Sequence, residues 1–292
     1  MSKNKNYMQT IRSLLATSRE KLKNAQIPSY SLDADLLMSH VLKISKAEIF
    51  CYPMRTLSQN EEQHFNELVQ RRVAREPMSH ILGIREFWGR EFIVNKNTLD
   101  PRPDSESLIE QVLELYDNNP PAKILDLGTG TGCLLLTLLS EFTDSEGVGA
   151  DISEAAISVA KENSLKLGLA KRSSFVVSNW GKSIKGNYNL IISNPPYIKY
   201  SDIEGLEPEV SKYEPIQALD GGNTGLECYI ELAPQIFNLL SEGGFAVLEH
   251  GIGQETAIRE ILENNNLSFV NYKQDLAGIN RCITVRKNKG IC

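Results

Sequence analysis

Lys123-Ile124-Leu125-Asp126-Leu127 runs directly into Gly128-Thr129-Gly130-Thr131-Gly132, and this stretch decides the fold. Its first half is an apolar run with the length of a buried β-strand, and its glycines let the backbone turn sharply into a following helix. Strand-like and helix-like segments of similar size alternate from there to the end of the chain. The alternation predicts an α/β fold with a parallel sheet covered by helices on both faces.

The predicted elements of the sheet region follow one another closely. We expect strands at 123–127, 147–151, 174–178, 189–193, 244–249, 268–272 and 281–286. We expect helices at 105–116, 133–139, from a Ser153 cap to 167, at 226–240 and after 254. The last two strands, joined through Ala277-Gly278, should form a hairpin that adds one antiparallel strand at the edge of the sheet.

The chain before residue 83 reads as short amphipathic helices. We expect one from Tyr7 to Ala25, one capped by Ser31, and one capped by Ser58 with Glu61 in a capping box. They predict a small helical bundle at 1–82 that docks the substrate, followed at 83–103 by a β-hairpin and a linker. The sheet domain then occupies 104–292.

The composition argues against a membrane protein, a secreted protein, a metalloprotein and a nucleic-acid-binding protein. The 292 residues are 41% apolar and 23% charged, as in an ordinary globular protein, and no apolar run approaches the roughly 20 residues of a membrane span. With no signal peptide, we expect a cytoplasmic protein. The five cysteines and four histidines lack metal-ligand spacing, so no metal is expected. A net charge of −6 makes nucleic acid an improbable partner, although Arg71, Arg72 and Arg75 form a local basic cluster.

A cofactor site is predicted at the turn after the first strand of the sheet. The spacing is G-x-G-x-G behind Asp126, whereas a dinucleotide site has G-x-G-x-x-G, so a smaller amino-acid nucleoside fits better. Asp151 ends the next strand and can accept hydrogen bonds from both ribose hydroxyls. The predicted cofactor-binding residues of this turn and strand are Gly128, Thr129, Gly130, Thr131, Gly132 and Asp151.

A second loop, Asn194-Pro195-Pro196-Tyr197, follows the fourth strand and lies at the same sheet edge. An amide nitrogen is a poor nucleophile, so an enzyme must orient the NH₂ group and accept its hydrogens while a methyl group arrives. Asn194 offers a side-chain carbonyl and Pro195 a main-chain carbonyl, both preorganised because proline fixes φ. Tyr197 can stack on a planar substrate group. We therefore predict Asn194, Pro195 and Tyr197 as catalytic, with Pro196 completing the substrate-binding loop.

These motifs, together with Gly83-Ile84-Arg85-Glu86-Phe87-Trp88, Pro101 to Glu106 and Leu248 to Gly251, are similar to those of the release factor glutamine methyltransferases, the HemK/PrmC family. The resemblance covers the whole chain. It implies a Rossmann-like seven-stranded sheet and S-adenosyl-L-methionine as cofactor. It implies, as substrate, the glutamine of the Gly-Gly-Gln motif in class 1 peptide chain release factors, whose methylation supports translation termination. It adds Trp180 and Asn194 to the cofactor contacts and assigns the glutamine contacts to Asn194, Pro195, Pro196 and Tyr197.

Two positions depart from the family pattern. Asn179 stands before Trp180 where an aspartate is usual, which should weaken a hydrogen bond from the adenine amine. Asp100 replaces an apolar residue, and nothing in the sequence explains it.

The sequence alone leaves four other functions open. The loop also suits a methyltransferase acting on the adenine amine of DNA, although the acidic composition and the lack of an extra domain oppose this. A glutamine of a ribosomal protein is a second possible substrate. An NAD-dependent oxidoreductase is the third, and the glycine spacing disfavours it. A non-catalytic binding module is the fourth, and the intact Asn-Pro-Pro-Tyr loop disfavours it.

Overall fold

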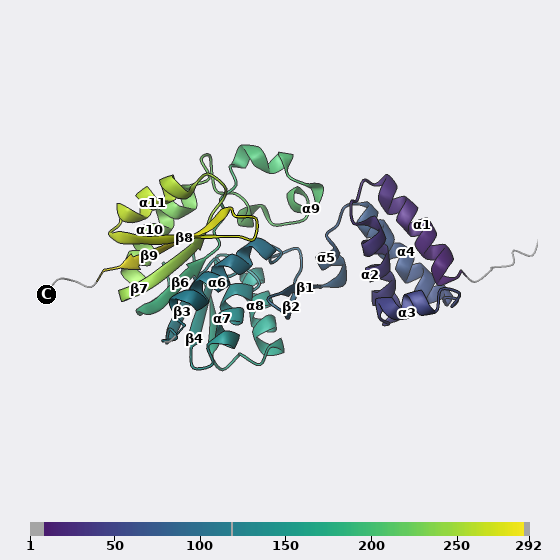
Figure 1. Ribbon diagram of the computed structural model, residues 1–292, viewed down its shortest axis with the longest axis horizontal. Helices are drawn as coiled ribbons and strands as arrows, with labels where there is room; N and C mark the ends of the chain where they lie inside the picture. The colour runs from purple at the N-terminus through teal and green to yellow at the C-terminus, as the bar shows by residue number, and fades with distance from the viewer. Residues whose placement is uncertain (1–8, 118, 289–292) are drawn as a thin grey trace, which may run out of the picture. The chain divides into compact units, whose positions relative to one another are not determined.

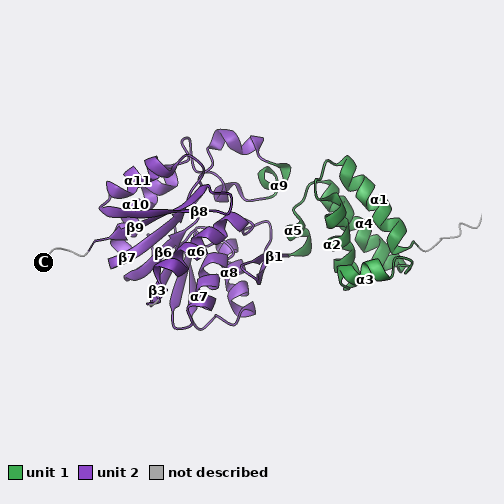
Figure 2. Cartoon of the chain, viewed as in Figure 1, with its two compact units in different colours: residues 1–83, 207–213 green, residues 84–206, 214–292 purple. Residues whose placement is uncertain are grey.

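The computed structural model describes residues 9–117 and 119–288, which divide into two compact units. The helical unit comprises residues up to Gly83 and the later segment Glu207–Tyr213. The sheet unit comprises Ile84–Leu206 and the chain from Glu214 onward. Figure 2 colours the two units separately. The sequence predicted a helical bundle that ends at residue 82 and a sheet domain that begins at 104, and it did not predict that the chain returns to the helical unit at 207–213. No helix among the described residues is long and apolar enough to cross a membrane.

The sheet unit is built on a seven-stranded sheet in the order β5-β4-β3-β6-β7-β9-β8. Its strands are β3 (Lys123–Leu127), β4 (Glu146–Asp151), β5 (Ser173–Val177), β6 (Tyr188–Ser193), β7 (Leu240–Glu249), β8 (Leu267–Gln274) and β9 (Asn280–Lys287). Neighbours from β5 to β7 are parallel, which confirms the predicted α/β class. A two-stranded antiparallel hairpin, β1 (Ile84–Phe87) and β2 (Arg90–Ile93), precedes it as predicted.

Helices cover both faces of the sheet (Figure 1). One apolar cluster joins α6 (Glu106–Leu115) and α7 (Cys133–Glu141) to one face, and α8 (Glu154–Lys166) packs on β4 and β5. The other cluster joins α10 (Glu227–Leu239) and α11 (Glu255–Glu263) to the opposite face. The two-residue period of a strand explains the division, since Ile124 of β3 belongs to the first cluster and Leu125 to the second.

The last hairpin enters the sheet differently from the prediction. One antiparallel strand is present, but it is β9, which lies between β7 and β8, and the edge strand is β8. Four consecutive β9 residues, from Cys282 to Val285, are buried, while β8 is half-exposed along most of its length. The more apolar strand takes the inner place because it can be covered on both faces.

The helical unit contains α1 (Ile11–Asn24), α2 (Tyr30–Leu42), α3 (Lys46–Cys51), α4 (Gln59–Val73), α5 (Met78–Leu82) and the short α9 (Pro208–Ser211). Ser58 and Glu61 form the predicted capping box of α4. The prediction that Ser31 caps α2 was wrong, because α2 already begins at Tyr30. The turn at Pro28, closed by a hydrogen bond from the Tyr30 N–H to the Ile27 carbonyl, starts the helix before Ser31. Tyr7, the predicted start of the first helix, lies outside the described residues.

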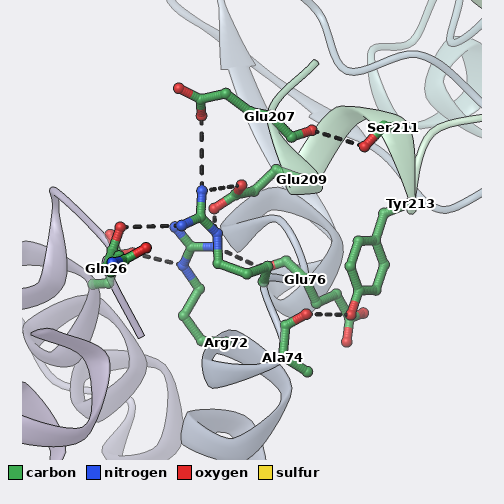
Figure 3. Close-up of polar contacts among 10 residues, drawn as sticks. Gln26, Arg72, Ala74, Glu76, Glu207, Glu209, Ser211 and Tyr213 are labelled. Atoms are coloured by element: carbon green, nitrogen blue, oxygen red, sulfur yellow. Dashed lines mark hydrogen bonds and ion pairs between the residues drawn. The ribbon is translucent and has the colours of Figure 1, made fainter. Parts of the chain in front are cut away.

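The basic cluster seen in the sequence is neutralised within the helical unit (Figure 3). Arg72 is buried and pairs with Asp33 at 2.7 Å and with Glu209 at 2.8 Å. Arg75 pairs with the other oxygen of Glu209 at 2.6 Å, and Arg71 pairs with Glu76. Because each guanidinium already faces a carboxylate, the cluster holds the returning segment Glu207–Tyr213 and is not a free phosphate-binding patch.

We predict that Arg72→Leu lowers the free energy of unfolding by about 3–5 kcal/mol, because the buried Asp33 carboxylate loses its partner. Arg71→Leu is the matched control on the same helix: its ion pair with Glu76 is partly exposed, so it should cost about 1 kcal/mol or less. Urea unfolding of both variants, followed by far-ultraviolet circular dichroism, measures the difference. Equal losses would contradict the role given to the Asp33 pair.

Candidate active site

The glycine turn after β3 has the conformation that its sequence predicts. Gly128, Gly130 and Gly132 all have positive φ, at 79°, 53° and 78°, which is unfavourable for other residues. The N–H groups of Gly128 and Thr129 both donate to the Ala150 carbonyl of β4, at 2.8 and 2.9 Å. At Gly132, a Cβ atom would also lie 3.3 Å from Ala160 of α8. The turn is therefore fixed by its neighbours.

Asp151, at the end of β4, faces this turn. One of its carboxylate oxygens accepts from the Gly130 N–H and the other from the Ser153 N–H, both at 2.9 Å. Ser153 caps α8 as predicted, with its side chain accepting from the Ala156 N–H. A carboxylate oxygen has a second acceptor position, so both oxygens can still receive a ligand hydroxyl.

Asp126 is the buried acid beneath the turn. One oxygen accepts from the Thr129 hydroxyl at 2.7 Å, and the other has no hydrogen-bond partner among the residues described. Burial raises the pKa of this carboxyl to about 7, and the nearby Asp151 carboxylate adds to the rise, while the Thr129 hydrogen bond opposes it. This acid beside the turn is thus balanced between its two protonation states near neutral pH.

The second loop emerges beside the first because β6 lies parallel to β3. Asp126 pairs in register with Ile192, and the Ser193 hydroxyl donates to the Leu127 carbonyl at 2.6 Å. The Asn194 side chain donates through Nδ2 to the Ser105 hydroxyl at 3.1 Å. The Tyr197 hydroxyl donates to Glu249 at 3.4 Å, and burial raises the pKa of Tyr197 well above its usual value.

A glycine-rich segment, residues 220–225, packs against the back of this loop. Ile198 pairs with Asp220, and a Cβ atom at Gly221 would lie 2.8 Å from the Cα atom of Tyr197. The Gln254 side chain donates to the Tyr197 carbonyl at 3.0 Å and to the Gly225 carbonyl at 3.2 Å. The loop is therefore held rigidly, which a site that works by positioning requires.

Both loops open into one cavity of about 410 Å³, large enough for a nucleoside-sized ligand. Most of the predicted cofactor residues line it: Gly128, Thr129, Gly130, Thr131, Asp151, Trp180 and Asn194. Of the predicted substrate residues, Asn194 and Pro196 line it. Gly132, Pro195 and Tyr197 are not among the lining residues, and Tyr197 turns its hydroxyl to Glu249.

Several lining residues were missed from the sequence. They come from the linker before α6 and from the segment after Tyr197: Asn97, Thr98, Leu99, Pro101, Arg102, Ser105, Pro215, Gln217, Ala218, Asp220, Cys228 and Glu231. Asp100 and Asn179, the two departures from the family pattern, also line the cavity. The two prolines around Arg102 were the available signal for the linker. Cys228 and Glu231 lie in the helix predicted at 226–240, whereas residues 215–220 carry no periodic pattern that could have placed them there.

Arg102 connects the linker before α6 to the segment after Tyr197, the two parts of the cavity wall described above. Its guanidinium donates to both oxygens of Glu214, at 2.8 and 2.7 Å, directly before the lining residue Pro215. Burial raises the pKa of the Glu214 carboxyl to about 7, with Arg102 opposing the rise. Among the described residues, no group of three or more His, Cys, Asp or Glu side chains is arranged to hold a metal ion.

Comparison with known proteins decides the family. The PrmC N-terminal domain family matches residues 13–83, and a methyltransferase domain family matches residues 118–285. A release factor glutamine methyltransferase of Rhodospirillum rubrum is 41% identical over 94% of this chain and 84% of its own length. The corresponding protein of Bradyrhizobium diazoefficiens is 39% identical over 96% and 95%.

The chain belongs to the release factor glutamine methyltransferase family. Members of this family are methyltransferases, and the two family matches cover most of the helical unit and both loops beside the cavity. The resemblance inferred from the motifs is thereby confirmed.

Solved structures agree at the level of the fold. A methyltransferase from Pyrococcus furiosus superposes with a TM-score of 0.52 at 18% identity, covering 70% of this chain and 91% of its own. The hMettl16 catalytic domain superposes with a TM-score of 0.58 at 15% identity, covering 77% and 84%. At this identity the likeness confirms the Rossmann-like methyltransferase sheet and carries no information about the substrate.

The raised pKa of Asp126 makes a prediction about stability. The folded protein keeps a proton on Asp126 up to about pH 7, whereas the unfolded chain releases it near 3.8, so the free energy of unfolding must fall as the pH rises through this window. Asp126→Asn removes up to about 4 kcal/mol of that fall. Urea unfolding between about pH 4 and pH 7 measures it, with the exposed Asp144→Asn as control. A parallel pH dependence in all three proteins would contradict the assignment.

Proposed function

We propose that this protein transfers a methyl group from S-adenosyl-L-methionine to the side-chain amide nitrogen of the glutamine in the Gly-Gly-Gln motif of class 1 peptide chain release factors. The observation that carries the proposal is that Asn194 and the glycine turn line the same cavity. One supplies acceptors for a planar NH₂ group, and the other suits an amino-acid nucleoside. The names of the similar proteins from Rhodospirillum rubrum and Bradyrhizobium diazoefficiens support the same substrate.

The residues around the cavity fit the proposed cofactor, which would supply an electrophilic methyl group. Both Asp151 oxygens retain acceptor positions for ribose hydroxyls. A Cβ atom on Gly128 would come within 3.2 Å of the Trp180 ring, so glycine lets the turn lie close to the aromatic wall of the cavity. Asn179, beside Trp180, can accept from an exocyclic amine through its side-chain carbonyl, more weakly than an aspartate would.

Asn194 and Pro195 orient the substrate amide. No donor among the described residues reaches Asn194 Oδ1 or the Pro195 carbonyl oxygen, so both can accept hydrogens from the glutamine NH₂ group. Methyl transfer would form one N–C bond and break the S–CH₃ bond of the sulfonium donor, which would leave as the neutral thioether S-adenosyl-L-homocysteine. The same nitrogen would release one proton to water, which turns –CONH₂ into –CONHCH₃. Positioning of this kind can contribute about 7–11 kcal/mol, so a general base is not needed in the rate-limiting step.

The proposed partner is a protein, and the helical unit is proposed to dock it. Two observations oppose a nucleic-acid substrate: the net charge is −6, and the Arg71, Arg72 and Arg75 guanidinium groups are engaged by acidic side chains. A protein that tracks a phosphate backbone needs free basic groups on one face.

Mass spectrometry of a class 1 release factor, a ribosomal protein mixture and DNA, each incubated with the enzyme and S-adenosyl-L-methionine, tests the proposal. We expect one added methyl group on the release factor glutamine and on nothing else. Asn194→Ala should lower kcat about 100-fold, because one preorganised acceptor is lost. The exposed Asn264→Ala serves as control. Methylation of DNA alone, or full activity of Asn194→Ala, would refute the proposal.

The cofactor contact is tested separately by calorimetry. We expect Asp151→Ala to raise the Kd of S-adenosyl-L-methionine about tenfold or more, because a carboxylate that accepts ligand hydroxyls is removed. Glu154→Ala, which removes an exposed acid in the first turn of α8, the helix that follows Asp151, should leave the Kd unchanged. An unchanged Kd in Asp151→Ala would rule out the ribose contact.

A further inference from the structure

Arg281 carries its charge at the end of the sheet from which the active-site loops leave. It is the second residue of β9, which pairs antiparallel with β7. The start of β9 therefore lies beside the carboxyl end of β7, where the His250 N–H donates to the Arg281 carbonyl at 2.8 Å. Arg281 does not line the cavity, so the contacts proposed for the cofactor and the substrate leave its side chain without a role.

The Arg281 guanidinium lies between two carboxylates. Its Nε donates to Asp275 at 2.7 Å, and its Nη2 pairs with Asp104 at 2.9 Å. The other Asp275 oxygen accepts from the N–H groups of Ala277 and Ile279, at 2.8 and 3.0 Å. Asp275 is thus fixed by the turn between β8 and β9. Because a guanidinium is planar, the bond that Asp275 makes to Nε directs Nη2 toward Asp104.

Asp104 belongs to the turn Pro103–Ser105, which leads into α6. A second contact holds this turn to β9. The Ser107 hydroxyl donates to the Asp104 carbonyl at 2.6 Å and lies 3.4 Å from Cys282 Sγ. Arg281 and Cys282 are neighbours in β9, so one short stretch of the strand holds both the side chain and the carbonyl of Asp104.

Ser105 connects this turn to the active-site loop. It is 3% exposed, and its hydroxyl accepts from Asn194 Nδ2 at 3.1 Å. Its N–H donates to the Arg102 carbonyl at 3.1 Å, so its backbone is held in the same turn as Asp104. A displacement of Asp104 therefore moves the Ser105 hydroxyl, and Asn194 loses a contact that orients its amide.

We propose that Arg281 is a positioning residue for methyl transfer. Through Asp104 it holds the turn before α6, and the Ser105 hydroxyl on that turn keeps the Asn194 amide in place. This inference rests on the proposed function, in which Asn194 accepts hydrogens from the substrate NH₂ group. An acceptor displaced by about 1 Å can lower a rate about 100-fold. Loss of the Arg281 pair should therefore lower kcat, while the cofactor contacts at the glycine turn stay intact.

The ion pair is partly exposed, which separates its effect on positioning from its effect on stability. The Asp104 side chain is 51% exposed, and the Asp275 side chain is 7% exposed. Exposed ion pairs contribute little to the free energy of unfolding, so a variant that removes only the Asp104 carboxylate should fold. Asp104→Ala is therefore the main test. Arg281→Ala, which also leaves the buried Asp275 carboxylate without its cation, is the second.

Steady-state kinetics on a class 1 release factor tests the role of Arg281. We expect Asp104→Ala and Arg281→Ala to lower kcat about tenfold, with the Kd of S-adenosyl-L-methionine within about twofold of wild type. Asp104→Glu keeps a charged acceptor and should hold kcat within about threefold of wild type. Arg286→Ala is the matched control, since this exposed arginine lies near the other end of β9, donates to the Gly243 carbonyl at 3.2 Å and should leave kcat unchanged.

A double-mutant cycle separates positioning from a general structural effect. If Asp104 acts through Asn194, adding Asp104→Ala to Asn194→Ala should lower kcat no further. The same result is expected in Ser105→Ala, because the contact that Asp104 positions is already absent. A general structural effect of Asp104→Ala would instead persist in both backgrounds and would also lower the midpoint of urea unfolding.

Additive losses in the cycle, or wild-type kcat in both Asp104→Ala and Arg281→Ala, would overturn the role given to Arg281. Failure of the proposed function looks different: the wild-type enzyme would leave the release factor unmethylated, or Asn194→Ala alone would keep full activity. Neither of these results depends on residue 104 or 281.

Discussion

The parallel pairing of β3 with β6 is the constraint on which the rest of the site depends. Parallel strands end at the same edge of a sheet, so the turn after Leu127 and the loop after Ser193 leave it side by side. The hydrogen bond from the Ser193 hydroxyl to the Leu127 carbonyl ties the two exits together. A slip of one residue in this register would turn the buried faces of β6 toward the wrong clusters, so the packing of the core also fixes the distance between the loops.

The parts of the molecule that obey local rules could be predicted from the sequence. The strand at 123–127, the glycine turn and the Ser58 and Ser153 caps depend on residues within a few positions of one another. One capping prediction was wrong for an equally local reason. Ser31 has the side chain of an N-cap residue, but the turn at Pro28 starts the helix before it. The order of β8 and β9 in the sheet depends on which of the two strands is more deeply buried, and the pattern of either strand alone does not predict this.

The cavity wall shows a different limit. The lining residues between 97 and 105 and between 215 and 220 share a cavity with the glycine turn only because the fold brings them there, and no periodic pattern marks them. The chain also passes between the two units three times, at 83/84, 206/207 and 213/214. The wall residues from Pro215 onward therefore follow directly on a segment that Arg72 and Arg75 hold in the helical unit. The segment held in the helical unit is therefore joined directly through the backbone to the wall of the cavity.

Two buried acids beside the cavity destabilise the core but accept hydrogen bonds from the two loops. Asp126 and Glu249 are almost fully buried, each has an oxygen without a hydrogen-bond partner among the described residues, and burial raises both pKa values to about 7. A core designed only to be stable would replace them with apolar side chains. An apolar residue at 126 would leave the Thr129 hydroxyl of the glycine turn without the acceptor that it has at 2.7 Å. An apolar residue at 249 would remove the acceptor of the Tyr197 hydroxyl in the same way, so each buried acid holds a residue of one of the two loops.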